Sequence, residues 1–322
     1  MSYIYFSYFL IGLTALSIIY AVQLALDTSQ YGVRRCAEVE NFMTSVERVV
    51  TYTELTPETG YGTETKPPKD WPNKGRIAIK DMSLVYYPGG PKILKNLNFQ
   101  IMPGEKIGIA GRTGAGKSSL VSALFRMPEP RGEIFIDDVD FLSLNLQKAR
   151  QGISVITQDP VLFNSTLRMN LDPFERYADH SIWQALEGAS LKPLVEGLSE
   201  QLSHEVTECG SNFSVGERQL ICLARALLLR NKVIIMDEAT ANVDYKTDKL
   251  IHNTIRTQFE DCTVITIAHR LDTILSYDRV MVLEDGQVVE FDTPEILLRK
   301  DHGALATLYY SQHDRLQCVQ KS

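Results

Sequence analysis

The chain has 322 residues and a formal net charge of −7 at pH 7, with a sequence pI of about 5.5. This acidity argues against a nucleic-acid partner, because nucleic-acid grooves are lined by clustered lysine and arginine side chains. The five cysteines include no C-x-x-C pair, which favours reduced thiols in the cytosol over a disulfide framework or a zinc site.

Residues 3–26 form an apolar stretch of 24 residues without a charged side chain, and about 20 are enough to cross a bilayer. A secretory signal is disfavoured because no basic residue precedes the stretch and because such signals are shorter. Arg34 and Arg35 follow it, which predicts that the C-terminal side faces the cytosol. The alternative is a buried core helix of a soluble protein.

The sequence predicts four parts. Residues 1–55 are a transmembrane helix with a cytosolic helical extension, 56–75 a linker rich in proline and glycine, 76–313 the compact domain, and 314–322 a C-terminal tail. The extension carries an apolar stripe at helical spacing, which needs either a neighbouring helix or the chain's own domain as its partner. The stripe consists of Val39, Phe42, Met43, Val46, Val49 and Val50.

The compact domain is predicted to be of the α/β class, with a parallel core sheet, an antiparallel β layer and a helical subdomain. Residues 158–230 are the predicted helical arm, and residues 281–289 a hairpin that turns at Asp285 and Gly286. The antiparallel layer is predicted from residues 77–87, 97–101 and 133–136.

Tyr86, which follows the first of these strands, is a candidate for stacking on a nucleobase, because base–aromatic stacking requires no particular base. Tyr87 is a rival for this role. Packing in the core is the alternative for either ring.

Residues 111–118 fit the phosphate-binding pattern G-x-x-x-x-G-K-[ST], between an apolar strand at 106–110 and a predicted helix at 119–126. Glycines let the backbone wrap a triphosphate, Lys117 would reach the outer phosphates, and Ser118 would bind Mg²⁺. An accidental glycine-rich turn is the alternative. The predicted ATP contacts here are Gly111, Arg112, Thr113, Gly114, Ala115, Gly116, Lys117, Ser118 and Ser119.

Two carboxylates, Asp237 and Glu238, close the apolar run at 233–236, and ligands of open α/β sheets collect at the carboxyl ends of strands. Asp237 would hold Mg²⁺, and Glu238 would polarise the attacking water. Two solvated acids at a strand end are the alternative.

His269 and Gln158 follow two further β-branched runs, at 263–268 and 154–157. His269 could contact the γ-phosphate and orient the nucleophile, and Gln158 could contact both metal and water. Taken singly, a structural histidine and an ordinary surface glutamine are the alternatives. Together with Glu238 and Lys117, these two residues complete the predicted catalytic set.

The ordered set of motifs resembles that of an ABC-transporter nucleotide-binding domain. In that family a signature segment, usually LSGGQ, opens a helix and closes on ATP held by a partner domain. Here the resemblance places it at Ser214, Val215, Gly216 and Glu217. Val215 stands where the family usually has glycine and Glu217 where it has glutamine, so we expect this signature to serve a poorly hydrolysing site. Such asymmetry resembles subfamily C, the multidrug resistance-associated proteins.

The resemblance implies that ATP hydrolysis with Mg²⁺ drives export of organic anions or xenobiotics. It also implies three partners: a second nucleotide-binding domain in the same full-length chain or another subunit, a transmembrane helix bundle, and the lipid bilayer of the plasma membrane. The chain would then be the C-terminal portion of a longer transporter. Two alternatives stay open: an ATP-sensing regulatory or channel-gating module of the same fold, and a soluble ABC-type ATPase of DNA repair or translation.

Overall fold

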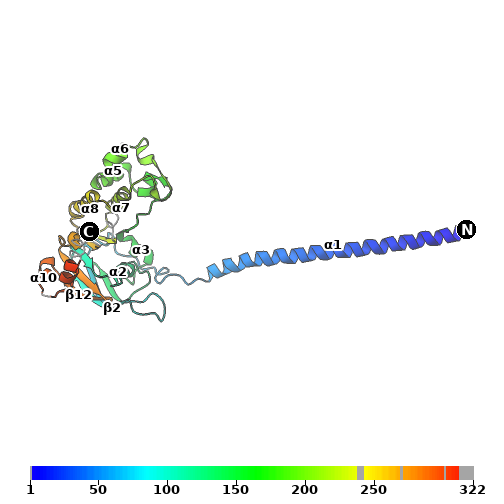
Figure 1. Ribbon diagram of the computed structural model, residues 1–322, viewed down its shortest axis with the longest axis horizontal. Helices are drawn as coiled ribbons and strands as arrows, with labels where there is room; N and C mark the ends of the chain where they lie inside the picture. Colours follow the sequence, from blue (N-terminus) through cyan, green and yellow to red (C-terminus); the bar gives the residue numbers. More distant parts are fainter. Residues whose placement is uncertain (1, 238–242, 269–270, 301, 312–322) are drawn as a thin grey trace, which may run out of the picture. The chain divides into compact units, whose positions relative to one another are not determined.

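The computed structural model describes residues 2–237, 243–268, 271–300 and 302–311. The chain divides into two compact units, Met1–Glu58 and Thr59–Ser322. The predicted C-terminal tail at 314–322 lies outside the described residues. Figure 1 shows a long helix in the first unit and the sheets and remaining helices in the second.

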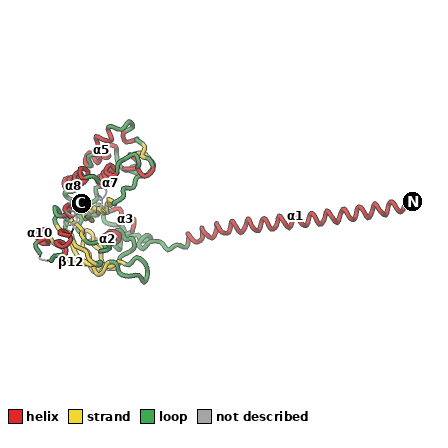
Figure 2. Tube along the Cα trace, viewed as in Figure 1, coloured by secondary structure: helices red, strands yellow, loops and turns green. Residues whose placement is uncertain are grey.

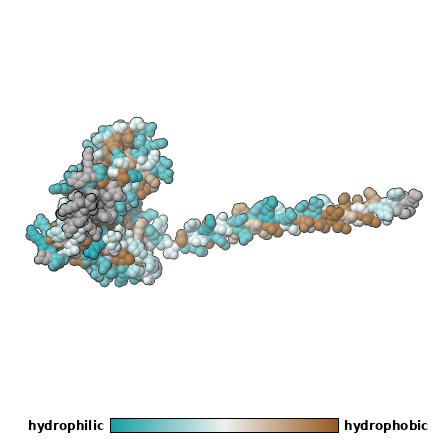
Figure 3. Space-filling view, viewed as in Figure 1, coloured by the Kyte–Doolittle hydropathy of each residue, from teal (hydrophilic) through white to brown (hydrophobic). Residues whose placement is uncertain are grey.

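The first unit is built on one helix, α1 (Ser2–Thr53). The predicted membrane span and its amphipathic extension are therefore parts of one continuous helix. Tyr5–Thr53 is long and apolar enough to cross a membrane, judged by length and composition. Figure 3 shows that the apolar residues of α1 gather in its N-terminal half, and that polar residues become frequent further along. The apolar side chains of the span are exposed within the unit.

A six-stranded sheet forms the centre of the second unit. Five of its strands are parallel and one edge strand is antiparallel, joined by the hairpin predicted at Asp285 and Gly286. Both turn residues have positive φ (47° and 76°), as a two-residue hairpin turn of this type requires. In spatial order the strands are β12 (Gln287–Asp292), β11 (Arg279–Glu284), β3 (Lys106–Ala110), β10 (Thr263–Ile267), β9 (Val233–Asp237) and β6 (Ile153–Ile156).

A four-stranded antiparallel sheet packs on one face of this central sheet, which confirms the predicted antiparallel layer. Its strands in spatial order are β2 (Leu94–Ile101), β1 (Ile77–Leu84), β4 (Arg131–Ile136) and β5 (Val139–Asp140). A short pair, β7 (Ser165–Thr166) and β8 (Glu205–Val206), forms a third sheet.

The helices between β6 and β9 gather at one end of the second unit, and most of the strands lie at the other (Figure 1, Figure 2). These helices, α4 to α7, occupy the predicted helical arm at 158–230. The labelled α-helices among the described residues of the unit are α2 (Lys117–Leu124), α3 (Leu146–Gln151), α4 (Leu167–Leu171), α5 (Asp179–Gly188), α6 (Lys192–Glu196), α7 (Val215–Leu229), α8 (Tyr245–Gln258), α9 (Leu271–Ile274) and α10 (Pro294–Leu298). Residues 304–311 are helical as well. Two 3₁₀ turns lie at Gln201–Ser203 and Glu208–Gly210.

Both faces of the central sheet are buried, which explains why its strands are continuous apolar runs. In β9, Val233 and Ile235 belong to the hydrophobic cluster shared with the antiparallel sheet and α2. Ile234 and Met236 point to the other face and belong to the cluster shared with the arm and α8. Alternating side chains of one strand thus join the two halves of the unit.

Residues 59–75, which we call the strap, belong to the second unit and precede the predicted domain start at Arg76. Trp71 stacks on Phe141, with ring centroids 6.3 Å apart, and its Nε1 donates a 2.9 Å hydrogen bond to the carbonyl of Ile136. The Oγ1 of Thr263 donates to the carbonyl of Gly75 at 2.7 Å. Proline and glycine set the local path of this segment, whereas contacts with distant residues hold it in place.

Asp137 fixes the end of the strap. Its carboxylate accepts hydrogen bonds from the backbone N–H groups of Asn73 (2.7 Å), Lys74 (2.9 Å) and Arg76 (2.8 Å). Burial alone would raise the pKa of Asp137, but these backbone donors outweigh burial and hold its pKa below the ordinary 3.8. The charged carboxylate is therefore the form that stabilises the fold.

We expect Asp137→Asn to destabilise the chain at pH 7 by about 1 kcal/mol, a modest effect because solvent screens a half-exposed carboxylate. A depressed pKa contributes stability above the unfolded value, and this contribution is lost as pH falls through the folded pKa. The difference between variant and wild type should therefore be constant above about pH 5 and should shrink as the pH falls below about 4. Thermal unfolding from pH 7 to pH 3 measures this, with the exposed neighbour Asp138→Asn as the control. A difference that is as large at pH 3 as at pH 7 would contradict this role of the charge.

Candidate nucleotide-binding site

The glycine-rich loop 111–118 joins the carboxyl end of β3 to the start of α2. Gly111, Gly114 and Gly116 have φ values of 156°, 82° and 102°, which L side chains rarely adopt. A Cβ on Gly111 would lie 2.5 Å from the carbonyl oxygen of Leu283, whereas a Cβ on Gly114 would meet no atom within 4 Å. The loop is therefore tight against the sheet on one side and open at its tip, where a ligand can approach the backbone.

Lys117 places its ammonium group inside this loop. Its Nζ donates to the carbonyls of Gly111 (2.8 Å) and Arg112 (3.3 Å). Helix α2 starts here after Gly116, which provides no side-chain cap, so the first N–H groups of the helix are not satisfied by a capping side chain. A positive ammonium beside uncapped helix N–H groups fits a polyphosphate in both charge and hydrogen-bonding capacity.

Tyr86 lies beside the same helix start. Its hydroxyl donates to the Oγ of Ser119 at 3.0 Å, and the residue is 48% exposed. The ring of Tyr87 instead folds over its own turn, since a Cβ on Gly90 would lie 2.9 Å from its Cζ. Of the two candidates, Tyr86 therefore has a ring near the loop that remains accessible for stacking.

Asp237 and Gln158 lie at the same edge of the sheet as the loop, because β6, β9, β10 and β3 are consecutive parallel strands. Helix α2 contacts β9, so the strand that ends at Asp237 runs beside the helix that contains Ser118. The carbonyls of Thr157 and Gln158 accept hydrogen bonds from the Nε2 of Gln219 at 3.0 and 2.7 Å. This contact ties the segment after β6 to the arm helix α7. Ser118, Asp237 and Gln158 offer the hydroxyl, carboxylate and amide oxygens that suit Mg²⁺.

Glu238 and His269, the predicted water-activating residues, lie outside the described residues. Their positions in the chain follow β9 and β10, whose carboxyl ends belong to the edge just described. Their roles stay predictions.

The signature segment opens the arm helix α7 and forms a capping box. The Oγ of Ser214 accepts from the N–H of Glu217 at 3.3 Å, and the Oε2 of Glu217 accepts from the N–H of Ser214 at 2.7 Å. The carboxylate of Glu217 is thus directed to its own helix start. The pattern Ser-x-x-Glu before an apolar helix is a capping signature that the sequence already contains, and it explains the acidic residue at this position structurally. Gly216 is buried against α8, where a Cβ would lie 3.1 Å from the Cγ2 of Thr247.

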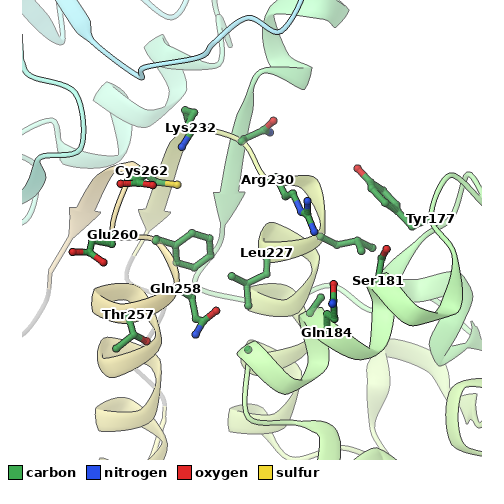
Figure 4. Close-up of a pocket in the computed structure, with 16 residues that line it drawn as sticks. Tyr177, Ser181, Gln184, Leu227, Arg230, Lys232, Thr257, Gln258, Glu260 and Cys262 are labelled. Carbon is green, nitrogen blue, oxygen red and sulfur yellow. The ribbon is translucent and has the colours of Figure 1, made fainter.

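A separate cavity of 740 Å³ lies at the amino ends of β9 and β10, between α5, α7 and α8. Figure 4 shows Arg230 and Tyr177 on one side of it and Glu260 and Cys262 on the other. The cavity lies at the amino ends of these strands, whereas the glycine-rich loop lies at the carboxyl end of the parallel strand β3. The two are therefore distinct. Its lining carries two cations, Arg230 and Lys232, and two acids, Glu260 and Asp261, so the charges balance and select no class of ligand. Burial raises the pKa of Cys262 at its rim, so this thiol stays protonated at neutral pH.

This fold and this loop define an ATPase domain of the ABC transporter type. The chain contains an ABC transporter domain, which is matched over residues 94–241. The domain also resembles a solved bacterial Atm1-family ABC exporter with ATP bound, with a TM-score of 0.77 and 27% identity, covering 85% of this chain and 48% of that one.

Within the family the chain is of the subfamily C type, as the motifs predicted. It is 48% identical over 305 residues to ATP-binding cassette sub-family C member 4 of Homo sapiens, covering 95% of this chain and 23% of that protein. It is 52% identical over 279 residues to the probable multidrug resistance-associated protein lethal(2)03659 of Drosophila melanogaster, covering 85% of this chain and 20% of that protein. The chain spans about a fifth of the length of these curated relatives.

Proposed function

We propose that this chain binds ATP with Mg²⁺ and hydrolyses ATP as the nucleotide-binding part of a membrane exporter. The observation that carries the proposal is the ammonium of Lys117, held in a loop of three glycines at positive φ beside the uncapped start of α2. This combination of backbone freedom, positive charge and free N–H groups suits a triphosphate. The subfamily C relatives support the same function.

In this proposal the triphosphate lies along the loop, with Lys117 and the first N–H groups of α2 against its oxygens, and the base stacks on Tyr86. Ser118, Asp237 and Gln158 would hold Mg²⁺, which when bound neutralises the charge on the phosphate oxygens. Glu238 accepts a proton from the attacking water, and His269 orients that water and contacts the γ-phosphate.

A second nucleotide-binding domain completes the site. In the proposed assembly, its signature closes on the ATP held by this chain, while Ser214, Val215, Gly216 and Glu217 close on the ATP of the partner. The capping box supports the expectation that this second site hydrolyses poorly, because the N–H of Ser214 is already engaged by Glu217. The hydrogen-bonding capacity of this helix start for a phosphate is reduced accordingly.

Helix α1 provides the proposed membrane anchor, with the ATPase domain in the cytosol and the plasma membrane as the location. One helix cannot line a pathway, so the transmembrane bundle would be completed by other segments or chains. Organic anions or xenobiotics are the substrate class that the subfamily C relationship favours.

The direct test is ATP turnover after Glu238→Gln in the assembled transporter. Removing the general base should lower turnover by about 10²- to 10⁴-fold while ATP binding persists. Glu260→Gln, an exposed acid at the amino end of β10, is the matched control and should leave turnover unchanged. Near wild-type turnover for Glu238→Gln would contradict the assigned roles.

The same preparation separates the alternatives. Tight ATP binding without turnover by the wild-type protein would favour an ATP-sensing or gating module. Recovery of the chain in the soluble fraction after membrane fractionation would favour a soluble ABC-type ATPase.

A further inference from the structure

Gln219 is an amide side chain buried on the arm helix α7, with 1% of its surface exposed. Its Nε2 donates to two successive backbone carbonyls, those of Thr157 at 3.0 Å and Gln158 at 2.7 Å. Both partners are carbonyl oxygens, which only accept, so the nitrogen end of the amide has to face them. A single buried side chain therefore joins α7 to the segment that follows β6.

The two carbonyls flank the Cα of Gln158. The carbonyl of Thr157 belongs to the peptide group before this Cα, and the carbonyl of Gln158 belongs to the peptide group after it. Because peptide groups are planar, holding both of them sets the direction in which the Gln158 side chain leaves the backbone. The side chain itself is exposed, so packing does little to orient it. The backbone then decides where the amide oxygen of Gln158 can reach.

The rest of this segment is anchored without Gln219. On one side, Ile156 is the last residue of β6 and is paired with β9. On the other side, the Nη1 of Arg225 donates to the carbonyl of Val161 at 2.8 Å, and Leu162 is buried in the hydrophobic cluster shared with the arm and α8. Loss of the Gln219 amide would thus release two peptide groups and leave the path of the segment in place.

The oxygen end of the same amide argues against a role in stability alone. The Oε1 of Gln219 is buried and has no hydrogen-bond partner in the part of the chain that the structure describes. A buried polar atom without a partner lowers stability. Methionine has a similar length and would fill the position without this cost. The amide is therefore better explained by what its nitrogen holds than by packing.

We propose that Gln219 is a positioning residue for Gln158, through which α7 sets the orientation of this Mg²⁺ ligand. The inference rests on the proposed function, in which Gln158 binds Mg²⁺ together with Ser118 and Asp237. Removing a group that orients a metal ligand typically lowers metal affinity or activity by about 10- to 100-fold, although the group does not touch the metal. Gln219 is assigned no contact with ATP or Mg²⁺, and its effect reaches the site through Gln158.

The test is a Mg²⁺ titration of the assembled transporter with two readouts: steady-state ATP hydrolysis, and equilibrium binding of a labelled non-hydrolysable ATP analogue. Gln219→Met should raise the Mg²⁺ concentration for half-maximal turnover, and for half-maximal tightening of analogue binding, about tenfold. Analogue affinity without Mg²⁺ should stay within about twofold of wild type, and the thermal midpoint within about 2 °C. Gln184→Met is the matched control, because Gln184 is exposed on α5 and its Nε2 lies 3.0 Å from the Nε2 of His180 on the same helix.

A double variant shows whether the effect passes through Gln158. Gln158→Ala alone should raise the Mg²⁺ requirement, because it removes the proposed ligand. Adding Gln219→Met should then change nothing further, since alanine at position 158 has no amide to orient. A structural role of Gln219 would instead give effects that add.

Three results would overturn the inference: an unchanged Mg²⁺ requirement in Gln219→Met, a loss of Mg²⁺-free analogue affinity together with a lower thermal midpoint, or additive effects in the double variant. Failure of the proposed function is distinguishable from these. If wild type shows no Mg²⁺-dependent turnover, the proposed function itself fails. If Gln158→Ala leaves the Mg²⁺ requirement unchanged, the metal role of Gln158 fails and the positioning role with it. If Gln158→Ala raises the requirement and Gln219→Met does not, the positioning role alone is refuted.

Discussion

Lys117→Ala should lower the affinity of the chain for Mg²⁺–ATP by at least about a hundredfold, which corresponds to roughly 2.8 kcal/mol. The ammonium already lies within the loop, 2.8 Å from the carbonyl of Gly111, so little reorganisation is needed for it to meet a phosphate. Charge-assisted hydrogen bonds to phosphate are about twice as strong as neutral ones. Removing the ammonium also leaves the charge of the triphosphate uncompensated.

Equilibrium binding of labelled ATP to the full chain measures this effect. Lys148→Ala is the matched control, because Lys148 is exposed on α3 and donates to Gln151 rather than to the loop. The thermal midpoint of Lys117→Ala without nucleotide should stay close to wild type, since the carbonyls that Lys117 contacts can turn to water. Unchanged ATP affinity in this variant would remove the main support for the nucleotide site.

Much of the second unit could be predicted from local patterns. The core strands are β-branched runs because both faces of the sheet are buried, and Ile234 and Ile235 illustrate this by entering different clusters. The glycine-rich loop and the hairpin at Asp285 and Gly286 depend on local backbone conformations with positive φ, which the residue types at these positions predict. The capping box of Ser214 and Glu217 is equally local, although the family signature draws attention only to the charge of Glu217.

Contacts between residues far apart in the chain were beyond such patterns. Composition predicts a linker at 56–75, yet Trp71 packs on Phe141 and the carbonyl of Gly75 accepts a hydrogen bond from Thr263. The docking depends on partners that no local period reveals. The hydrogen bond from the Oγ1 of Thr266 on β10 to the hydroxyl oxygen of Tyr277, which follows α9, is a similar case. A search for isolated polar residues inside apolar runs would have singled out Thr266 but not its partner.

Arg126→Met should destabilise the chain by about 3–5 kcal/mol, a large share of the roughly 5–15 kcal/mol that typical domains possess. The side chain of Arg126 is fully buried after the end of α2, and its Nε donates to the Oε2 of Glu129 at 2.7 Å. Its Nη1 donates to the carbonyls of Phe141 (3.2 Å) and Leu144 (2.9 Å), and its Nη2 to that of Thr59 (3.4 Å). Methionine fills the space but leaves a carboxylate and these carbonyls without their donor.

Chemical unfolding of the full chain measures the loss, and Arg131→Met, an exposed arginine on β4, should change stability by no more than about 0.5 kcal/mol. Arg126→Lys should recover little, because one ammonium cannot reproduce a planar fork that reaches three carbonyls. Thr59 begins the strap, so the amides at 59–65 should exchange hydrogen faster in Arg126→Met than in wild type. This exchange should occur through local opening, at a lower free energy than global unfolding. An unfolding free energy equal to that of the control would mean that the strap is held without this guanidinium. Asn145 would then be the next candidate, because its Nδ2 donates to the carbonyls of Tyr61 and Thr63.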